Sequence, residues 1–192
     1  MNRLKTMAMV AVMAGVMAAV PSPAGATTLE VKGVAQAGAV ELTASMEVAF
    51  SMLLQSTSGA FANTCTASHF STKTTSYTGA TVGGPINTLT YTSCTTSPVV
   101  VDEAGSFSIE RIGTTTNGTV RSSGTKTTVP SPLGGTLTCV TGEGVDLGTL
   151  RGVKEGSATL EIRAVINCGF LAPSVNWSAS YTITTSGVGV TG

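Results

Sequence analysis

The stretch "ELTASMEVAFSMLL", Glu41 to Leu54, decides the fold class because its polarity alternates with a period of two. Apolar side chains occupy every second position from Leu42 to Leu54, and the glutamates and two of the serines lie between them. Successive side chains of a β-strand point to opposite faces, whereas an α-helix would scatter both sets around its circumference. The stretch therefore predicts one long, half-buried strand. A turn near Gly59 and a returning partner strand are expected after it.

The same alternation recurs along the rest of the chain, with Gly, Pro, Asn and Ser in the gaps. Further strands are expected at 86–94, 99–101, 106–112, 119–121, 126–129, 135–140, 145–153, 158–168 and 177–183. Short strands without intervening helices predict an all-β fold, either an antiparallel β-sandwich or a flattened barrel of roughly eight to ten strands. Residues 27–39 are expected to form an edge strand or a loose arm, and residues 185–192 are expected to fray.

The first 26 residues have the features of a secretory signal peptide. Basic residues at Arg3 and Lys5 precede an apolar run from Met7 to Val20, and small residues end at Ala26. An apolar run of about 14 residues is short for a bilayer span, so cleavage after Ala26 is expected and no transmembrane segment is predicted. Residues 27–192 are then a single domain that is secreted, extracellular or associated with the cell surface.

Charge and composition narrow the classes of partner. Charged residues make up 10% of the chain, and removal of the signal peptide leaves eight basic residues against ten acidic ones. Without a basic stripe no nucleic-acid partner is expected. The polar surface must instead come from Thr, Ser, Asn and Gly, a composition that favours strands and turns.

Four cysteines follow the signal peptide, and an even number in an exported chain predicts disulfides. The interval from Cys65 to Cys94 is 29 residues, and the interval from Cys139 to Cys168 is the same. The repeated interval favours these two pairs among three possible connectivities, and it leaves an internal duplication open. Strand parity places the second pair on the core face, as a structural crosslink.

The only histidine, His69, lies four residues after Cys65. A catalytic cysteine needs a free thiolate beside a base, and a zinc site needs four ligands, so a disulfide at Cys65 removes both interpretations. No catalytic residue and no cofactor are therefore expected. The poorly patterned connection after Cys65, which carries His69, Phe70 and Tyr77, is the first candidate for a ligand-binding loop.

Acidic residues provide two further candidate sites. A catalytic carboxylate pair would come from Asp102, Glu103, Glu110, Glu143, Asp146, Glu155 and Glu161. Glu110 and Glu161 lie on the polar faces of their strands near arginines, which favours surface ion pairs. Glu143 and Asp146, in "TGEGVDLG", are the remaining candidates for calcium, although they lack the spacing of a defined loop, and no metal site is predicted.

Several segments carry a resemblance to known proteins. With its signal peptide, "GPINTLTYTSC", "VPSPLGGTLTC", "NCGF" and "WSASYTIT", the chain resembles small secreted bacterial β-proteins with two disulfides. More loosely, it is similar to the secreted activators of alkane oxidation of pseudomonads. The resemblance covers residues 63–187 and implies a β fold and export. It also implies a link to growth on hydrophobic substrates, and it transfers no functional residue.

These observations favour an exported, non-enzymatic binding protein, or a surface-associated structural protein, of bacteria. One alternative is a carrier or dispersant of apolar molecules, with a cavity lined by residues such as Met46, Phe50 and Met52. Another is a secreted hydrolase that uses a carboxylate pair. Long alternating strands such as 42–54 also suggest self-association through strand edges.

Overall fold

The computed structural model describes residues 25–46, 52–56, 59, 62–131 and 134–192, and these residues form strands and connections without a helix. Its strands are β1 (Thr27–Val31), β2 (Val34–Ala35), β3 (Glu41–Met46), β4 (Met52–Ser56), β5 (Ala62–Lys73), β6 (Thr78–Gly79), β7 (Val82–Cys94), β8 (Val100–Glu103), β9 (Ser106–Arg111), β10 (Gly118–Ser123), β11 (Lys126–Pro130), β12 (Thr136–Val140), β13 (Val145–Arg151), β14 (Ser157–Ile166), β15 (Val175–Ser186) and β16 (Val188–Thr191).

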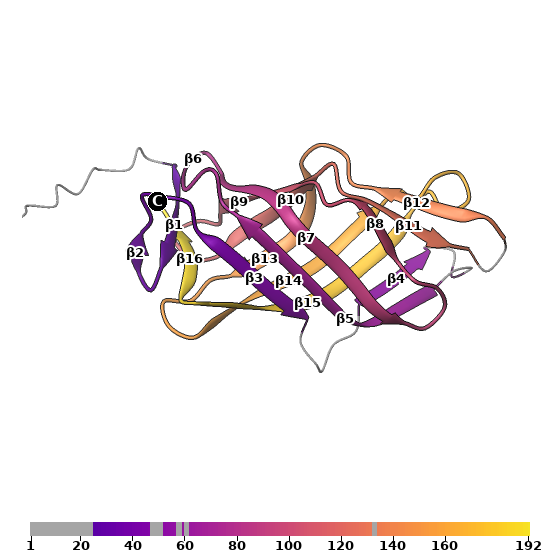
Figure 1. Ribbon diagram of the computed structural model, residues 1–192. Helices are drawn as coiled ribbons and strands as arrows, with labels where there is room; N and C mark the ends of the chain where they lie inside the picture. The colour runs from indigo at the N-terminus through magenta and orange to yellow at the C-terminus, as the bar shows by residue number, and fades with distance from the viewer. Residues whose placement is uncertain (1–24, 47–51, 57–58, 60–61, 132–133) are drawn as a thin grey trace, which may run out of the picture.

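Eight of these strands close into an antiparallel barrel (Figure 1). The order is β14, β13, β10, β9, β7, β5, β3 and β15, and the pairing of β15 with β14 completes the ring. Apolar side chains on alternate positions of each strand face the interior, as the period-two pattern predicts. The predicted all-β fold is confirmed, and it takes the form of a barrel.

The segment predicted as one uninterrupted strand is divided into β3 and β4. Both pair with β5 and with β15, so they occupy the same position in the ring. Ser45 lies opposite His69, and Met52 lies opposite Cys65. An advance of seven residues from β3 to β4 therefore corresponds to an advance of only four residues along β5. The two segments are therefore out of register by three residues, and a single strand is the wrong description. The expected return strand is confirmed as β5.

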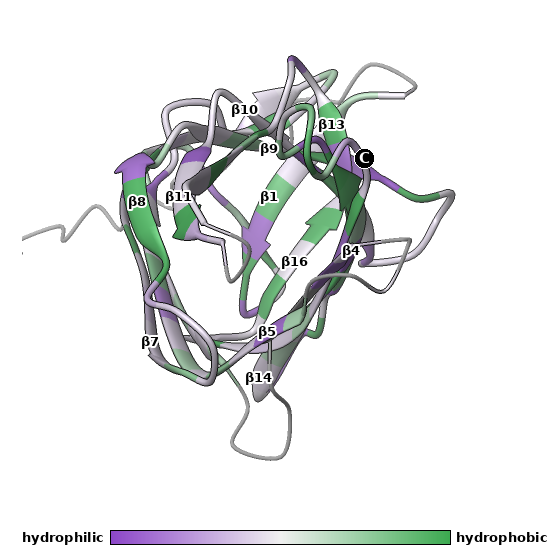
Figure 2. Cartoon of the chain, turned by 90° about the vertical axis from the view of Figure 1, so that its right-hand side faces the viewer, coloured by the Kyte–Doolittle hydropathy of each residue, from purple (hydrophilic) through white to green (hydrophobic). Residues whose placement is uncertain are grey.

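One end of the barrel is covered by a small sheet of β16, β1 and β2, with β6 paired to β1. Figure 2 looks along the barrel, and β1 and β16 are visible through the ring. Leu29, Val188 and Val190 of this sheet are fully buried. The chain enters β16 through Gly187, whose φ of 73° is a conformation that favours glycine. The expectation that residues 185–192 fray is wrong, because β16 pairs with β1 over four residue pairs.

A separate sheet of three strands, in the order β12, β11 and β8, lies at the other end, along one side of the opening (Figure 2). Val129 and Leu137 of this sheet are buried in the core. The Val140 amide donates to the Asn167 carbonyl at 3.0 Å, which joins β12 to the connection after β14. The sheet is thus attached to the barrel where β14 ends.

Both predicted disulfides are present. Cys65 and Cys94 lie directly opposite each other on the paired strands β5 and β7. Cys139 and Cys168 join β12 to the residues that follow β14, and both are buried, as parity predicts. The two disulfides therefore have the same separation of 29 residues but different places in the fold. One joins two paired strands of the barrel, and the other joins the three-stranded sheet to the barrel.

Because β3 is paired on both sides within a closed ring, it presents no free edge for association between molecules. Within the described ranges there is no helix long and apolar enough to cross a membrane.

Candidate ligand cavity

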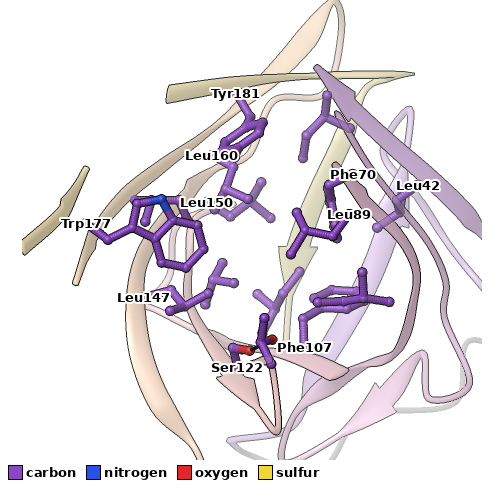
Figure 3. Close-up of a pocket in the computed structure, with 16 residues that line it drawn as sticks. Leu42, Phe70, Leu89, Phe107, Ser122, Leu147, Leu150, Leu160, Trp177 and Tyr181 are labelled. Carbon is purple, nitrogen blue, oxygen red and sulfur yellow. Dashed lines mark hydrogen bonds between the residues drawn. The ribbon is translucent and has the colours of Figure 1, made fainter. Parts of the chain in front are cut away.

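The barrel encloses an apolar cavity of about 60 Å³ (Figure 3). All eight barrel strands contribute side chains to its wall, because each strand directs alternate residues inward. The wall consists of Leu42, Phe70, Ile86, Leu89, Phe107, Ile109, Val120, Ser122, Thr125, Leu147, Leu150, Leu160, Ile162, Trp177, Tyr181 and Ile183. Twelve of these sixteen side chains are purely hydrocarbon, so the cavity suits an apolar molecule.

Three of the four polar side chains at the wall have hydrogen-bond partners. The hydroxyls of Ser122 and Thr125 lie 2.7 Å apart, and Thr125 Oγ1 donates to the Ala104 carbonyl at 2.9 Å. The Tyr181 hydroxyl lies 2.9 Å from Ser68 Oγ. These groups are satisfied by the protein and leave an otherwise apolar surface.

Trp177 is the exception. It lies on β15, is only 7% exposed, and projects its indole ring into the cavity (Figure 3). Its ring packs edge to face against Tyr91, with ring centroids 6.4 Å apart. The buried indole Nε1–H has no hydrogen-bond partner, and it is the single buried side-chain donor or acceptor in this state among the described residues.

A smaller cavity of about 20 Å³ lies beneath the three-stranded sheet. Its wall is formed by Tyr91, Val99, Thr125, Thr127, Cys139, Thr141, Ile166 and Trp177. Thr125 and Trp177 belong to the walls of both cavities. The two cavities are therefore neighbours, and the smaller one is richer in hydroxyl groups.

Two tyrosines of the interior titrate abnormally. Burial raises the pKa of Tyr181 to about 12, although its hydrogen bond with Ser68 opposes the shift. Burial also raises the pKa of Tyr91 well above its ordinary value, and the nearby Tyr181 raises it further. Both shifts follow from the cost of placing a phenolate in an apolar interior.

The candidate loop residues His69, Phe70 and Tyr77 are not brought together. Residues expected to form a poorly patterned connection are instead the strands β5, β6 and β7. Phe70 faces the central cavity and packs against Phe107, with ring centroids 6.0 Å apart. His69 is exposed on the outer face, and Tyr77 lies in the connection to β6, where its carbonyl accepts a hydrogen bond from the Leu29 amide at 2.9 Å. The loop prediction failed because threonine, which is common in turns of this chain, fills the outward positions of these strands.

His69 borders an open depression of about 290 Å³ on the outer surface. Its Nδ1 lies 3.5 Å from Ser45 Oγ, a long contact between exposed groups. Met46 also borders this outer depression, and it does not line the central cavity. Phe50 and the side chain of Met52, the other residues predicted to line a cavity, lie outside the described part of the structure.

The candidate carboxylates lie on the outside of the molecule. Arg121 pairs with Glu110 across β10 and β9, and Arg151 pairs with Glu161 across β13 and β14, with Nε to Oε1 at 2.7 Å. The Arg151 guanidinium lowers the pKa of Glu161. These ion pairs join neighbouring strands, so the expectation that Glu110 and Glu161 form surface ion pairs is confirmed.

The remaining carboxylates, at Asp102, Glu103, Glu143, Asp146 and Glu155, are exposed, and none of the seven candidates lines a cavity found among the described residues. Glu143 lies in the connection before β13, and Asp146 lies on β13. No group of three or more potential metal ligands occurs within the described ranges.

The sequence did not predict which residues form the cavity. Trp177 and Tyr181 share one face of the strand expected at 177–183 by the period of two, and both are buried. Period-two alternation predicts an inward face equally for a sandwich and for a barrel, so it cannot show that β3 and β14 both pair with β15. Many inward-facing leucines, with few charges on any strand, were the available signal.

Comparisons with protein-family models, with curated proteins and with solved structures found no match to this chain. The site is therefore assigned by its geometry and chemistry.

Proposed function

We propose that this protein is an exported, non-enzymatic binding protein that holds a small apolar molecule inside its barrel. The observation that carries the proposal is the central cavity, to which all eight strands contribute apolar side chains. Barrels of about eight strands have interiors that are either filled by side chains or wide enough for one small ligand. The two disulfides support a working site in an oxidising compartment, outside the cytoplasm.

The physical chemistry of the cavity supports an apolar occupant. A water molecule needs two to four polar partners, and a wall on which three of the four polar side chains already have partners offers few. At about 24 cal/mol per Å³, an empty space of 60 Å³ costs about 1.4 kcal/mol of stability. A ligand that fills the space recovers part of this free energy. Since leucine and phenylalanine side chains change rotamer, the volume sets a lower limit on ligand size.

A hydrolase is less well supported, because none of the described carboxylates reaches a cavity. Glu110 and Glu161, the two that lie closest to barrel arginines, are engaged in ion pairs on the outer face. A carboxylate pair that acts on a bound substrate needs both groups in one pocket.

Xenon binding tests the proposal, because xenon occupies apolar cavities and has no polar contacts. We expect saturable chemical-shift changes in the amide signals of the residues around the cavity, such as Val120 and Leu147. Val120→Phe, which fills the cavity, should abolish saturation. Val165→Phe makes the same change at a position that is 59% exposed on β14, and it should leave xenon binding unchanged.

Thermal unfolding of both variants controls for loss of the fold. Shifts that rise linearly with xenon pressure, or that are the same in Val120→Phe and in the unaltered protein, would contradict binding in the cavity.

A further inference from the structure

We infer that the natural ligand is an apolar molecule with one hydrogen-bond acceptor oxygen, and that Trp177 Nε1–H donates to that oxygen. The inference rests on the proposed function, and it names the class of ligand: a small ketone, aldehyde, ester or alcohol, as distinct from a pure hydrocarbon. The acceptor lies at the end of the cavity near the three-stranded sheet, and the hydrocarbon part lies among the leucines.

The first argument is the state of the Trp177 donor. A buried N–H without a partner costs about 1 to 3 kcal/mol, so buried donors are nearly always satisfied. Here the Nε1–H has no partner, although the other polar side chains at the wall of the central cavity all have one. A phenylalanine at this position would have filled a similar space without that cost. The donor is therefore best explained by a group that the ligand brings.

The second argument is the position of Trp177. It lines both the central cavity and the smaller one, so a group next to its indole ring is in contact with both environments. The central cavity is surrounded mainly by leucine, isoleucine and phenylalanine side chains, whereas three threonines line the smaller one. An asymmetric ligand, apolar at one end and polar at the other, matches this division.

The third argument concerns the number of polar groups on the ligand. The Ser122, Thr125 and Tyr181 hydroxyls already have partners in the protein, so they do not require an additional one. No charged side chain lines either cavity, so a carboxylate or an ammonium group would be buried without a counter-charge. One neutral acceptor oxygen is the polarity that the site accommodates.

The experiment uses the single tryptophan of the chain. Its indole N–H gives one signal in a proton–nitrogen correlation spectrum, so the state of this donor is observed directly. The probes are cyclopentanone and methylcyclopentane, which have the same number of heavy atoms and differ in the acceptor oxygen. We expect cyclopentanone to move the indole proton signal downfield with saturation, and methylcyclopentane to leave it nearly in place.

Trp177→Phe removes the donor and keeps an aromatic ring. We expect it to weaken cyclopentanone binding about five- to tenfold, the effect of one lost hydrogen bond, and to change methylcyclopentane binding by less than about twofold. Amide shifts around Val120 report binding in this variant. If Trp177→Phe does not fold, the two probes compared on the unaltered protein still decide the question.

The possible outcomes separate the two proposals. If both probes bind, and Val120→Phe blocks both while the indole signal responds equally to each, the acceptor inference is overturned and the binding function stands. If neither probe binds and xenon also fails to bind, the proposed function is overturned, and the inference with it.

Discussion

The two ends of the barrel are built in different ways. At one end, β1 and β16 pair over four residue pairs and bury Leu29, Val188 and Val190 completely. At the other end, a separate three-stranded sheet lies along one side of the opening, and the Cys139–Cys168 disulfide ties it to the barrel. The first end is closed by a hydrogen-bonded ladder packed with aliphatic side chains, whereas the second is bordered by a sheet that a disulfide, backbone hydrogen bonds and buried side chains hold to the barrel.

The two ends of the barrel also differ in the cavities that lie next to their sheets. The disulfide-linked end retains the smaller cavity, with threonine hydroxyls and Trp177 in its wall. No hydrogen-bonded ladder crosses the opening at the disulfide-linked end, so less structure has to move there than at the end closed by β1 and β16. We therefore expect ligands to enter at the disulfide-linked end, and each of the following predictions tests this asymmetry.

The largest loss of stability is expected when Cys139→Ala is combined with Cys168→Ala. Loss of a disulfide with a separation of 29 residues should lower the free energy of unfolding by about 3.5 kcal/mol in the chain-entropy model. Because this disulfide holds the three-stranded sheet against the smaller cavity, whose wall includes Trp177, quenching of tryptophan fluorescence by acrylamide should increase as well. Urea unfolding and quenching titrations measure the two effects.

The other disulfide provides a matched control, because it has the same separation of 29 residues. Cys65→Ala combined with Cys94→Ala should cost a similar free energy of unfolding, since the closed loop is equally long. It links two strands that are already paired in the barrel wall, so acrylamide quenching of Trp177 should stay unchanged. Equal quenching in both double variants would remove the proposed asymmetry.

At the opposite end, Leu29→Ala should lower the free energy of unfolding by about 3 kcal/mol, because it leaves a cavity beneath β1. Trp177 should remain as protected as before, since the change is at the other end of the barrel. Val34→Ala, at a position that is 63% exposed on β2, should change stability by less than about 0.5 kcal/mol. Enhanced quenching in Leu29→Ala would indicate that both ends open together.

The interior itself should be sensitive to alkaline pH. In the unfolded chain Tyr181 has a pKa near 10, and in the folded protein burial raises it to about 12. Between these values the unfolded state has lost the proton and the folded state keeps it, so stability is retained below pH 10 and falls as the pH rises toward 12. The loss from Tyr181 should approach about 3 kcal/mol, since each pKa unit corresponds to about 1.4 kcal/mol.

Urea unfolding at a series of alkaline pH values checks this prediction, with tyrosinate absorbance as the direct probe of ionisation. Tyr181→Phe should give a shallower decline with pH, although Tyr91, whose pKa is also raised by burial, keeps part of the slope. A decline of the same steepness in Tyr181→Phe would show that the phenol of Tyr181 is not responsible.

The smallest effect is expected on the outer wall. Glu161→Gln breaks the ion pair with Arg151, whose side chain is 61% exposed, so the free energy of unfolding should fall by no more than about 0.5 kcal/mol. The difference should shrink in high salt, because exposed charges are screened. A loss comparable with that in Leu29→Ala would show that the wall, rather than the end closures, limits stability.

Much of the fold was predictable from the sequence, because period-two alternation identifies strands and their inward faces. Leu160 and Ile162 share one face of the strand expected at 158–168, and both are buried. The disulfide pairs followed from their repeated interval and are confirmed. The pattern did not reveal which strands are neighbours, because side-chain alternation carries no information on pairing between distant segments.

The terminal strands and the cavity were harder to predict for the same reason. The segment "TSGVGVTG" has little pattern of its own, and its order comes from pairing with β1 at the far end of the chain. His69 and Phe70 were treated as one loop, but their strand directs one outward and the other inward. The cavity depends on how eight inward faces fit together in three dimensions, which no local pattern specifies.

The pairing of β1 with β16 has a consequence for how the chain matures. Thr28 lies opposite Thr191, 163 positions later, so a chain made from its amino terminus lacks one side of this closure until its last strand emerges. Such long-range pairing delays closure of this end until β16 has been made. For the exported protein proposed above, this topology leaves that end of the barrel open while the chain crosses its membrane. This end of the barrel closes only when β1 and β16 pair.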